Sequence, residues 1–156
     1  MATETGAKPE PFLVTPTDET SPEFSPDGNY VAYVSSESDK DEVYIKPFPK
    51  GEGKWRVSTS GGALPHWSKR GNELFFVSGS DVMVVRVQTK PTLTLGTPQK
   101  LFSREGIRVD RPEGVVDGYD VTSDGQQFVI LEGVEAPNER RVLNVVQNWF
   151  AEFRRK

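Results

Sequence analysis

The sequence predicts an all-β protein made of three four-stranded blades of the β-propeller type. Short apolar runs are separated by turn residues, and 14 Gly and 12 Pro are spread along 156 residues, which favours many short strands. A sequence repeat places Gly28, Gly71 and Gly125 in register, 43 and 54 residues apart. A period of roughly 40–45 residues with four strands in each unit is typical of propeller blades.

The turn in each repeat follows from its residues. The three segments are Pro22-Glu-Phe-Ser-Pro-Asp-Gly28, Pro65-His-Trp-Ser-Lys-Arg-Gly71 and Tyr119-Asp-Val-Thr-Ser-Asp-Gly125. Proline presets φ in such a turn, aspartate binds its own backbone, and glycine takes a positive φ. We therefore expect Gly28, Gly71 and Gly125 to be structural, and Asp27 and Asp124 to serve the turns rather than catalysis.

Apolar runs on either side of these turns predict the strands. An innermost strand ends at Phe24, Trp67 and Val121, and nearly continuous apolar runs follow, as expected for strands covered on both faces. The second strands are expected at 30–34, 74–77 and 128–131, and the third strands at 43–46, 82–87 and 142–146. Fourth strands are expected at 55–58 and 99–102, and the third repeat lacks one.

The two ends of the chain complete this organisation. Residues 1–10 form a polar leader, and the blades occupy 11–156, with an additional strand at 11–14 and a short amphipathic helix at about 148–155. A closed propeller needs four to eight blades, so three blades would leave apolar faces and strand edges exposed. We therefore expect two chains to form a six-bladed ring, in which each strand 11–14 completes the last blade of the other chain.

The repeats resemble the TolB-like, WD-repeat-related propeller repeats. Their pattern is Pro-x-Phe-Ser-Pro-Asp-Gly followed by an apolar strand, and residues 22–33 match it almost completely. Residues 65–76 replace Pro-Asp by Lys69 and Arg70, and residues 119–130 are a looser copy. The stretches 41–49 and 144–149 are similar to the final blades of propellers that follow kinase domains in bacterial receptor-like proteins. No kinase signature is present, and one fold hosts many activities.

Composition excludes several functional classes. The formal net charge of −4 argues against a nucleic-acid surface, which needs a basic stripe. The absence of cysteine excludes disulfides, thiolate metal sites and cysteine nucleophiles. No apolar run is long enough to cross a bilayer, and no secretory signal is evident, so a cytoplasmic location is the default. A piece of a membrane-anchored parent would instead be periplasmic or extracellular.

The candidate ligand residues lie on the innermost strands. His66 is the only histidine and aligns with Glu23 and Asp120, which predicts a polar ring near an axial channel. The alternative is a set of solvated positions at strand ends. A serine hydrolase is disfavoured because no Gly-x-Ser-x-Gly elbow accompanies His66.

Two groups of carboxylates could be read as calcium sites. One comprises Asp39, Asp41 and Glu42, and the other lies in and beside the long loop 103–118, at Asp110, Glu113, Asp117 and Asp120. Neither group fits the calcium-loop pattern, so we expect solvated turns, no metal and no cofactor.

The sequence favours a non-catalytic binding or scaffolding module that associates with itself and with an unidentified protein or small molecule. One alternative is a channel-sited hydrolase or lyase that uses carboxylates or a metal. Another is a structural piece of a larger kinase- or peptidase-linked propeller, whose activity lies elsewhere.

Overall fold

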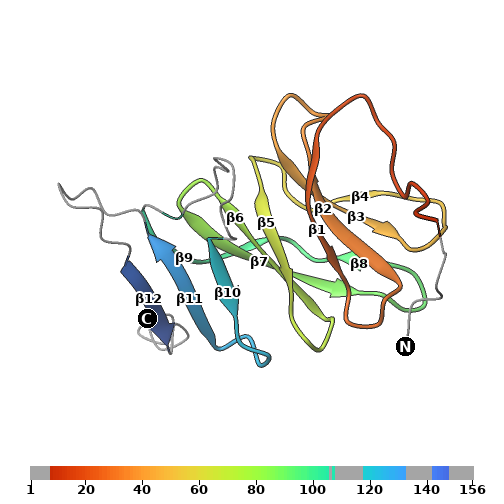
Figure 1. The fold of residues 1–156 in the computed structure, drawn as a ribbon. Helices are drawn as coiled ribbons and strands as arrows, with labels where there is room; N and C mark the ends of the chain where they lie inside the picture. Colours follow the sequence, from red (N-terminus) through yellow and green to blue (C-terminus); the bar gives the residue numbers. More distant parts are fainter. Residues whose placement is uncertain (1–7, 106, 108–117, 133–141, 148–156) are drawn as a thin grey trace.

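The protein is all-β in the part of the chain that the computed structural model describes, residues 8–105, 107, 118–132 and 142–147. Its strands form three antiparallel sheets that lie in a row, with the first sheet at the right of Figure 1 and the third at the left. No helix that could span a membrane is found among these residues. The predicted helix at about 148–155 lies outside them.

The first sheet is a meander in which each strand pairs with its neighbour in sequence. Its strands are β1 (Glu19–Phe24), β2 (Tyr30–Ser35), β3 (Glu42–Pro47) and β4 (Trp55–Arg56). Residues 31–35 are all buried, so β2 is covered on both faces, as its continuous apolar sequence predicts.

The second sheet differs in its outer strand, which is split in two. Its strands are β5 (Ala63–Trp67), β6 (Glu73–Ser78), β7 (Asp81–Gln88), β8 (Thr94–Leu95) and β9 (Gln99–Ser103). Both β8 and β9 pair with β7, at opposite ends of that strand. The third sheet contains β10 (Tyr119–Val121), β11 (Gln127–Glu132) and β12 (Val142–Gln147).

The three turns between the first and second strands of the sheets share one geometry. Gly28, Gly71 and Gly125 have φ of 70°, 70° and 72°, the left-handed conformation that the turn pattern predicts. In each turn the glycine N–H donates to the carbonyl three residues earlier, at 2.8 Å. The acceptors are Ser25, Ser68 and Thr122.

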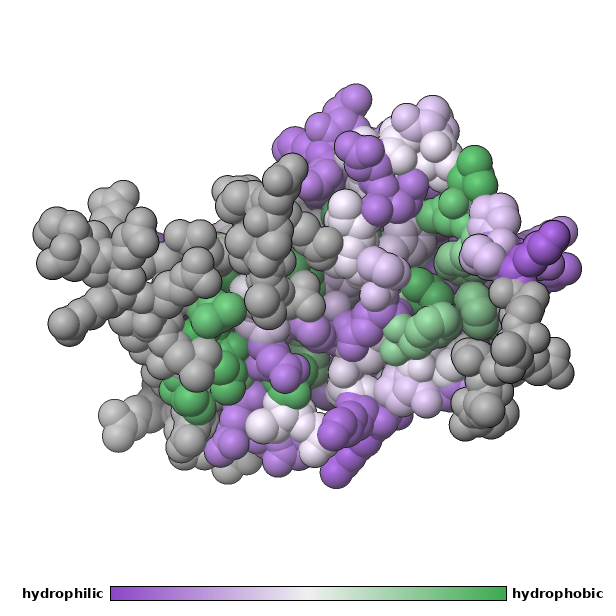
Figure 2. Space-filling view, viewed as in Figure 1, coloured by the Kyte–Doolittle hydropathy of each residue, from purple (hydrophilic) through white to green (hydrophobic). Residues whose placement is uncertain are grey.

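Two apolar cores hold the sheets together. The first lies between the first and second sheets and includes Ala32, Val34, Ile45, Trp67, Leu74, Phe76 and Val85. The second lies between the second and third sheets and includes Phe75, Val77, Val82, Leu101, Ile107, Tyr119, Phe128 and Ile130. On the face shown in Figure 2, apolar residues gather over the first and third sheets, with polar residues between them.

The strands differ from the expectation in three places. Within the single chain residues 11–14 form no strand, and the ring of Phe12 packs on Phe48 beside the first sheet, with centroids 5.4 Å apart; their pairing with a second chain stays a prediction. The strand expected at 55–58 ends at Arg56; beyond it the Val57 N–H still donates to the carbonyl of Val43, and the Ser58 hydroxyl accepts the N–H of Val43. The short strand β8 was not predicted.

Candidate functional site

A β-bulge shapes the inner strand of each of the first two sheets. In β1 the pairing shifts between Thr20 and Glu23, and in β5 it shifts between Ala63 and His66. Within these bulges Ser21 and Leu64 both have φ of 52°, although neither is glycine. A bulge re-aims the side chains that follow it, and non-glycine residues in this region are strained. The two bulges therefore give Glu23 and His66 equivalent positions.

The carboxylate of Glu23 joins the first two sheets at this position. One oxygen, Oε1, accepts the backbone N–H of Trp67 at 3.1 Å, and the other, Oε2, lies 3.1 Å from Nδ1 of His66. The side chains of His66 and Glu23 are 19% and 32% exposed, but Oε2 of Glu23 and Nε2 of His66 are themselves buried. The polar atoms of this pair therefore face each other and the protein, and they connect the first two sheets.

The third sheet reaches the same place through Tyr119. Its ring stands edge-on to His66, with centroids 4.8 Å apart, and its hydroxyl donates to the carbonyl of Leu64 at 2.8 Å. Asp120, by contrast, is exposed and accepts the N–H of Val121. The structure thus joins Glu23 and His66 in one pair, and Asp120 is hydrogen-bonded within its own strand.

The two turn aspartates make the hydrogen bonds expected of a turn. Asp27 accepts from the hydroxyl of Ser25 at 2.7 Å and from the N–H of Asn29 at 3.1 Å, and these contacts hold its pKa below the ordinary value. Asp124 accepts from the hydroxyl of Thr122 at 2.6 Å, which lowers its pKa in the same way.

Glu42 corrects the expectation of a solvated acidic turn. Asp39 and Asp41 are exposed, but Glu42 is fully buried. It forms an ion pair with Arg56 at 2.6 Å, accepts the hydroxyl of Ser58, and accepts the N–H of Gly61 at 3.2 Å. Burial alone would raise the pKa of Glu42, but these hydrogen bonds outweigh it and hold the pKa below the ordinary value.

No group of three or more His, Asp or Glu side chains suited to a metal ion occurs among the described residues. Asp110, Glu113 and Asp117 lie outside them.

Sequence reasoning missed Leu64, Trp67 and Tyr119 as parts of the inner-strand site. A signal for the bulge was present, because Ser21 and Leu64 each stand seven positions before a turn glycine. The Glu42 cluster could not be found in this way, because its partners follow in a different strand and loop.

No family model and no curated protein sequence matches this chain. Among solved structures, it is similar to the crystal structure of TolB from Acinetobacter baumannii, with 14% sequence identity and a TM-score of 0.44. The similarity covers 92% of this chain and 44% of the TolB chain. The chain therefore spans less than half the length of that TolB structure.

Proposed function

We propose that this chain is a non-catalytic β-propeller module that binds another molecule through its inner strands and closes its ring by self-association. The observation that carries this proposal is the repetition of one unit three times. Each sheet has the same glycine turn, and the inner strands adjoin, β1 with β5 and β5 with β10. Propellers arrange their blades in this way around a central axis.

The third sheet supplies the reason for self-association. Among the described strands, none pairs with the outer edge of β12, and Val145 on that strand is 53% exposed. An unpaired strand edge is a template for pairing with another chain. A two-fold dimer would bring the third sheet of each chain to the first sheet of the other, and the six sheets would then form a closed ring.

Strand exchange is the route that we propose for this closure. Residues 11–14 would leave Phe48, become extended and pair with β12 of the other chain. Pro11 and Val14 are exposed, Val14 by 81%, and Phe12 and Leu13 are half-buried, so only two of the four side chains would lose burial on release. The same movement would free the side of the first sheet that the third sheet of the partner must approach.

The contacts that Glu23 and His66 make argue against a catalytic role for them. The carboxylate of Glu23 already accepts the Trp67 N–H, and the ring of His66 already packs on Tyr119, so both groups connect sheets. A hydrolase or lyase would need one of them to act on a substrate as acid or base. Reproducible turnover of hydrolase substrates that disappears in His66→Ala would replace the binding proposal by the enzyme alternative.

The mass in solution tests the ring. Light scattering of the chain at micromolar concentration should give twice the monomer mass of 17.4 kDa. Deletion of residues 1–14 should shift the equilibrium toward monomer, whereas a deletion that stops at residue 7 should leave it unchanged. A soluble monomer at these concentrations would contradict the proposal, and a dimer unaffected by the longer deletion would contradict strand exchange.

A further inference from the structure

Two aromatic rings close one end of the space between the first and second sheets. Tyr30 and Trp55 pack edge-on, with ring centroids 6.4 Å apart, against the apolar core between these sheets. The hydroxyl of Tyr30 also donates to the carbonyl of Thr89 at 3.4 Å, in the loop after β7. This end of the interface is therefore filled by side chains of the protein itself.

In the second sheet, polar residues stand at the positions that correspond to Tyr30 and Trp55. The first of them is Glu73. Tyr30 stands two residues after Gly28, and Glu73 stands two residues after Gly71. On alternate positions of β6, Phe75 and Val77 face the third sheet, so Glu73 faces it too, just as Tyr30 faces the second sheet.

Strand register gives the second correspondence. Trp55 pairs with Ile45, and Ile45 pairs with Ala32, two positions after Tyr30. In the same way, Gln99 pairs with Val84, and Val84 pairs with Phe75, two positions after Glu73. Tyr30 and Trp55 in the first interface thus correspond to Glu73 and Gln99 in the second.

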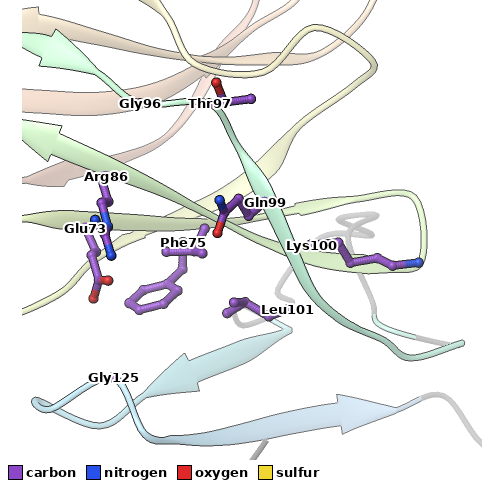
Figure 3. A pocket seen from close by; sticks show the side chains of 10 residues that line it. Glu73, Phe75, Arg86, Gly96, Thr97, Gln99, Lys100, Leu101 and Gly125 are labelled. Atoms are coloured by element: carbon purple, nitrogen blue, oxygen red, sulfur yellow. The ribbon is translucent and has the colours of Figure 1, made fainter. Parts of the chain in front are cut away.

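A hollow of about 560 Å³ lies where the aromatic pair is replaced. Glu73, Arg86 and Gln99 line it, with Phe75 and Leu101 at its apolar base and Gly125 of the third sheet opposite (Figure 3). Its volume is that of a site for a small ligand. A neighbouring hollow of about 530 Å³ shares Glu73, Arg86 and Gly96 with it, so a longer molecule could continue past these residues.

The charges in this hollow are arranged for a ligand with an anionic group and a donor. Glu73 and Arg86 are directly opposite one another on β6 and β7, yet no ion pair joins them or joins Arg86 to any other described residue. The ammonium of Lys100 points elsewhere, since it lies 3.5 Å from Asp81 and 3.2 Å from the Ser103 hydroxyl. Arg86 is therefore the cation that the hollow offers.

We propose that this hollow binds the carboxyl-terminal residue of a peptide that ends in an aromatic side chain. The ring would occupy the space that Tyr30 and Trp55 fill in the first interface. The guanidinium of Arg86 matches the fork of a carboxylate, and Glu73 can accept the N–H of the same terminal residue. A phosphate dianion fits less well, because it brings more negative charge to Glu73 and has no N–H that Glu73 could accept. The site is separate from the Glu23 and His66 pair and does not depend on self-association.

Calorimetric titration of the full chain with three probes tests the ligand class. The probes are N-acetyl-glycyl-glycyl-phenylalanine with a free carboxylate, the same peptide with an amidated end, and free phenylalanine. The free carboxylate should bind at least about ten-fold more tightly than the amide, the loss typical of a hydrogen bond to a charged group. Equal binding of the two peptides, or no binding of either, would overturn the proposal. If free phenylalanine bound as tightly as the peptide, the peptide would be refuted as the ligand, and the hollow would instead be a site for a free aromatic amino acid.

Substitutions locate the binding. In Arg86→Gln the preference for the free carboxylate should vanish, whereas Arg70→Gln, which removes an exposed arginine outside both hollows, should keep it. The double variant Glu73→Tyr with Gln99→Trp restores the aromatic pair of the first interface and should abolish binding without loss of thermal stability. Unchanged peptide affinity in the double variant, or an unchanged preference in Arg86→Gln, would place the binding elsewhere and refute the site.

Discussion

The hydroxyl of Tyr119 donates a hydrogen bond of 2.8 Å to the carbonyl of Leu64, the residue in the bulge of β5 that has φ of 52°. The left-handed conformation of Leu64 and the packing of the third sheet are therefore coupled. Because the hydroxyl and the side chain of Leu64 are both buried, water is a poor substitute for this contact.

Tyr119→Phe should lower the free energy of unfolding by about 1–2 kcal/mol, because it leaves the Leu64 carbonyl without this donor in the core. Tyr33→Phe is the matched control, since the hydroxyl of Tyr33 has no hydrogen bond to another described residue. Burial, followed by the charges of Glu37 and Glu19, raises the pKa of Tyr33 to about 12. Chemical denaturation of both variants measures the difference, and equal effects would contradict the role of the Tyr119 hydroxyl.

Ser21 should show the reverse of the usual strand preference. Glycine normally weakens a strand relative to alanine by roughly 0.5–1 kcal/mol, but Ser21 has φ of 52°, where an alanine is strained. Ser21→Gly should therefore be more stable than Ser21→Ala by about 1 kcal/mol. Both variants lack the hydroxyl, so the comparison isolates the backbone. At the neighbouring Thr20 we expect the ordinary order, in which the alanine variant is more stable than the glycine variant.

Gly125 should tolerate a methyl group less well than Gly28. Both have a φ near +70°, so alanine is strained at each by about 1 kcal/mol. An added Cβ at Gly28 would meet nothing within 4 Å, whereas at Gly125 it would lie 3.2 Å from the ring of Phe75. Thermal melts should show the larger loss for Gly125→Ala, by roughly a further 1 kcal/mol. A larger loss at Gly28 would contradict the packing of the third turn.

Glu42 should make stability depend on pH. Its pKa in the folded chain is lowered from an ordinary value of 4.5, so its full stabilisation is present above that value and is lost as the pH falls through the folded pKa. At neutral pH, Glu42→Gln should cost about 1–3 kcal/mol, because the buried donors lose their ionised acceptor. Denaturation between pH 7 and pH 3 should show the difference between wild type and variant shrinking toward acid. A constant difference would contradict the cause given for the shift.

The turns could be predicted because their chemistry is local. Gly28, Gly71 and Gly125, with the hydroxyl or carboxylate beside them, determine the backbone within four or five residues. The central strands β2 and β6 could be predicted equally well, since their apolar runs continue without polar interruption.

Features that depend on distant partners could not be predicted. Glu42 looked like part of an exposed acidic turn, because Arg56 and Ser58 come 14 and 16 residues later and only the folded sheet brings them together. The left-handed conformation of Leu64 contradicts its own preference and is maintained by contacts with the third sheet. The apolar residues 11–14 carried a strand signal, yet a strand needs a pairing edge, and in the single chain Phe12 packs on Phe48 instead.

Every strand in the described sheets pairs with one close to it in sequence, and this has a kinetic consequence. Hairpins of this kind close short loops, so each sheet can form early and independently. The contact between Glu23 and Trp67 spans 44 residues, and it can form only after the first two sheets exist. We therefore expect docking of preformed sheets, rather than strand pairing, to limit the folding rate, and substitutions at Glu23 to slow folding more than substitutions within a hairpin. During synthesis on the ribosome, the first sheet could then be complete before the second has emerged.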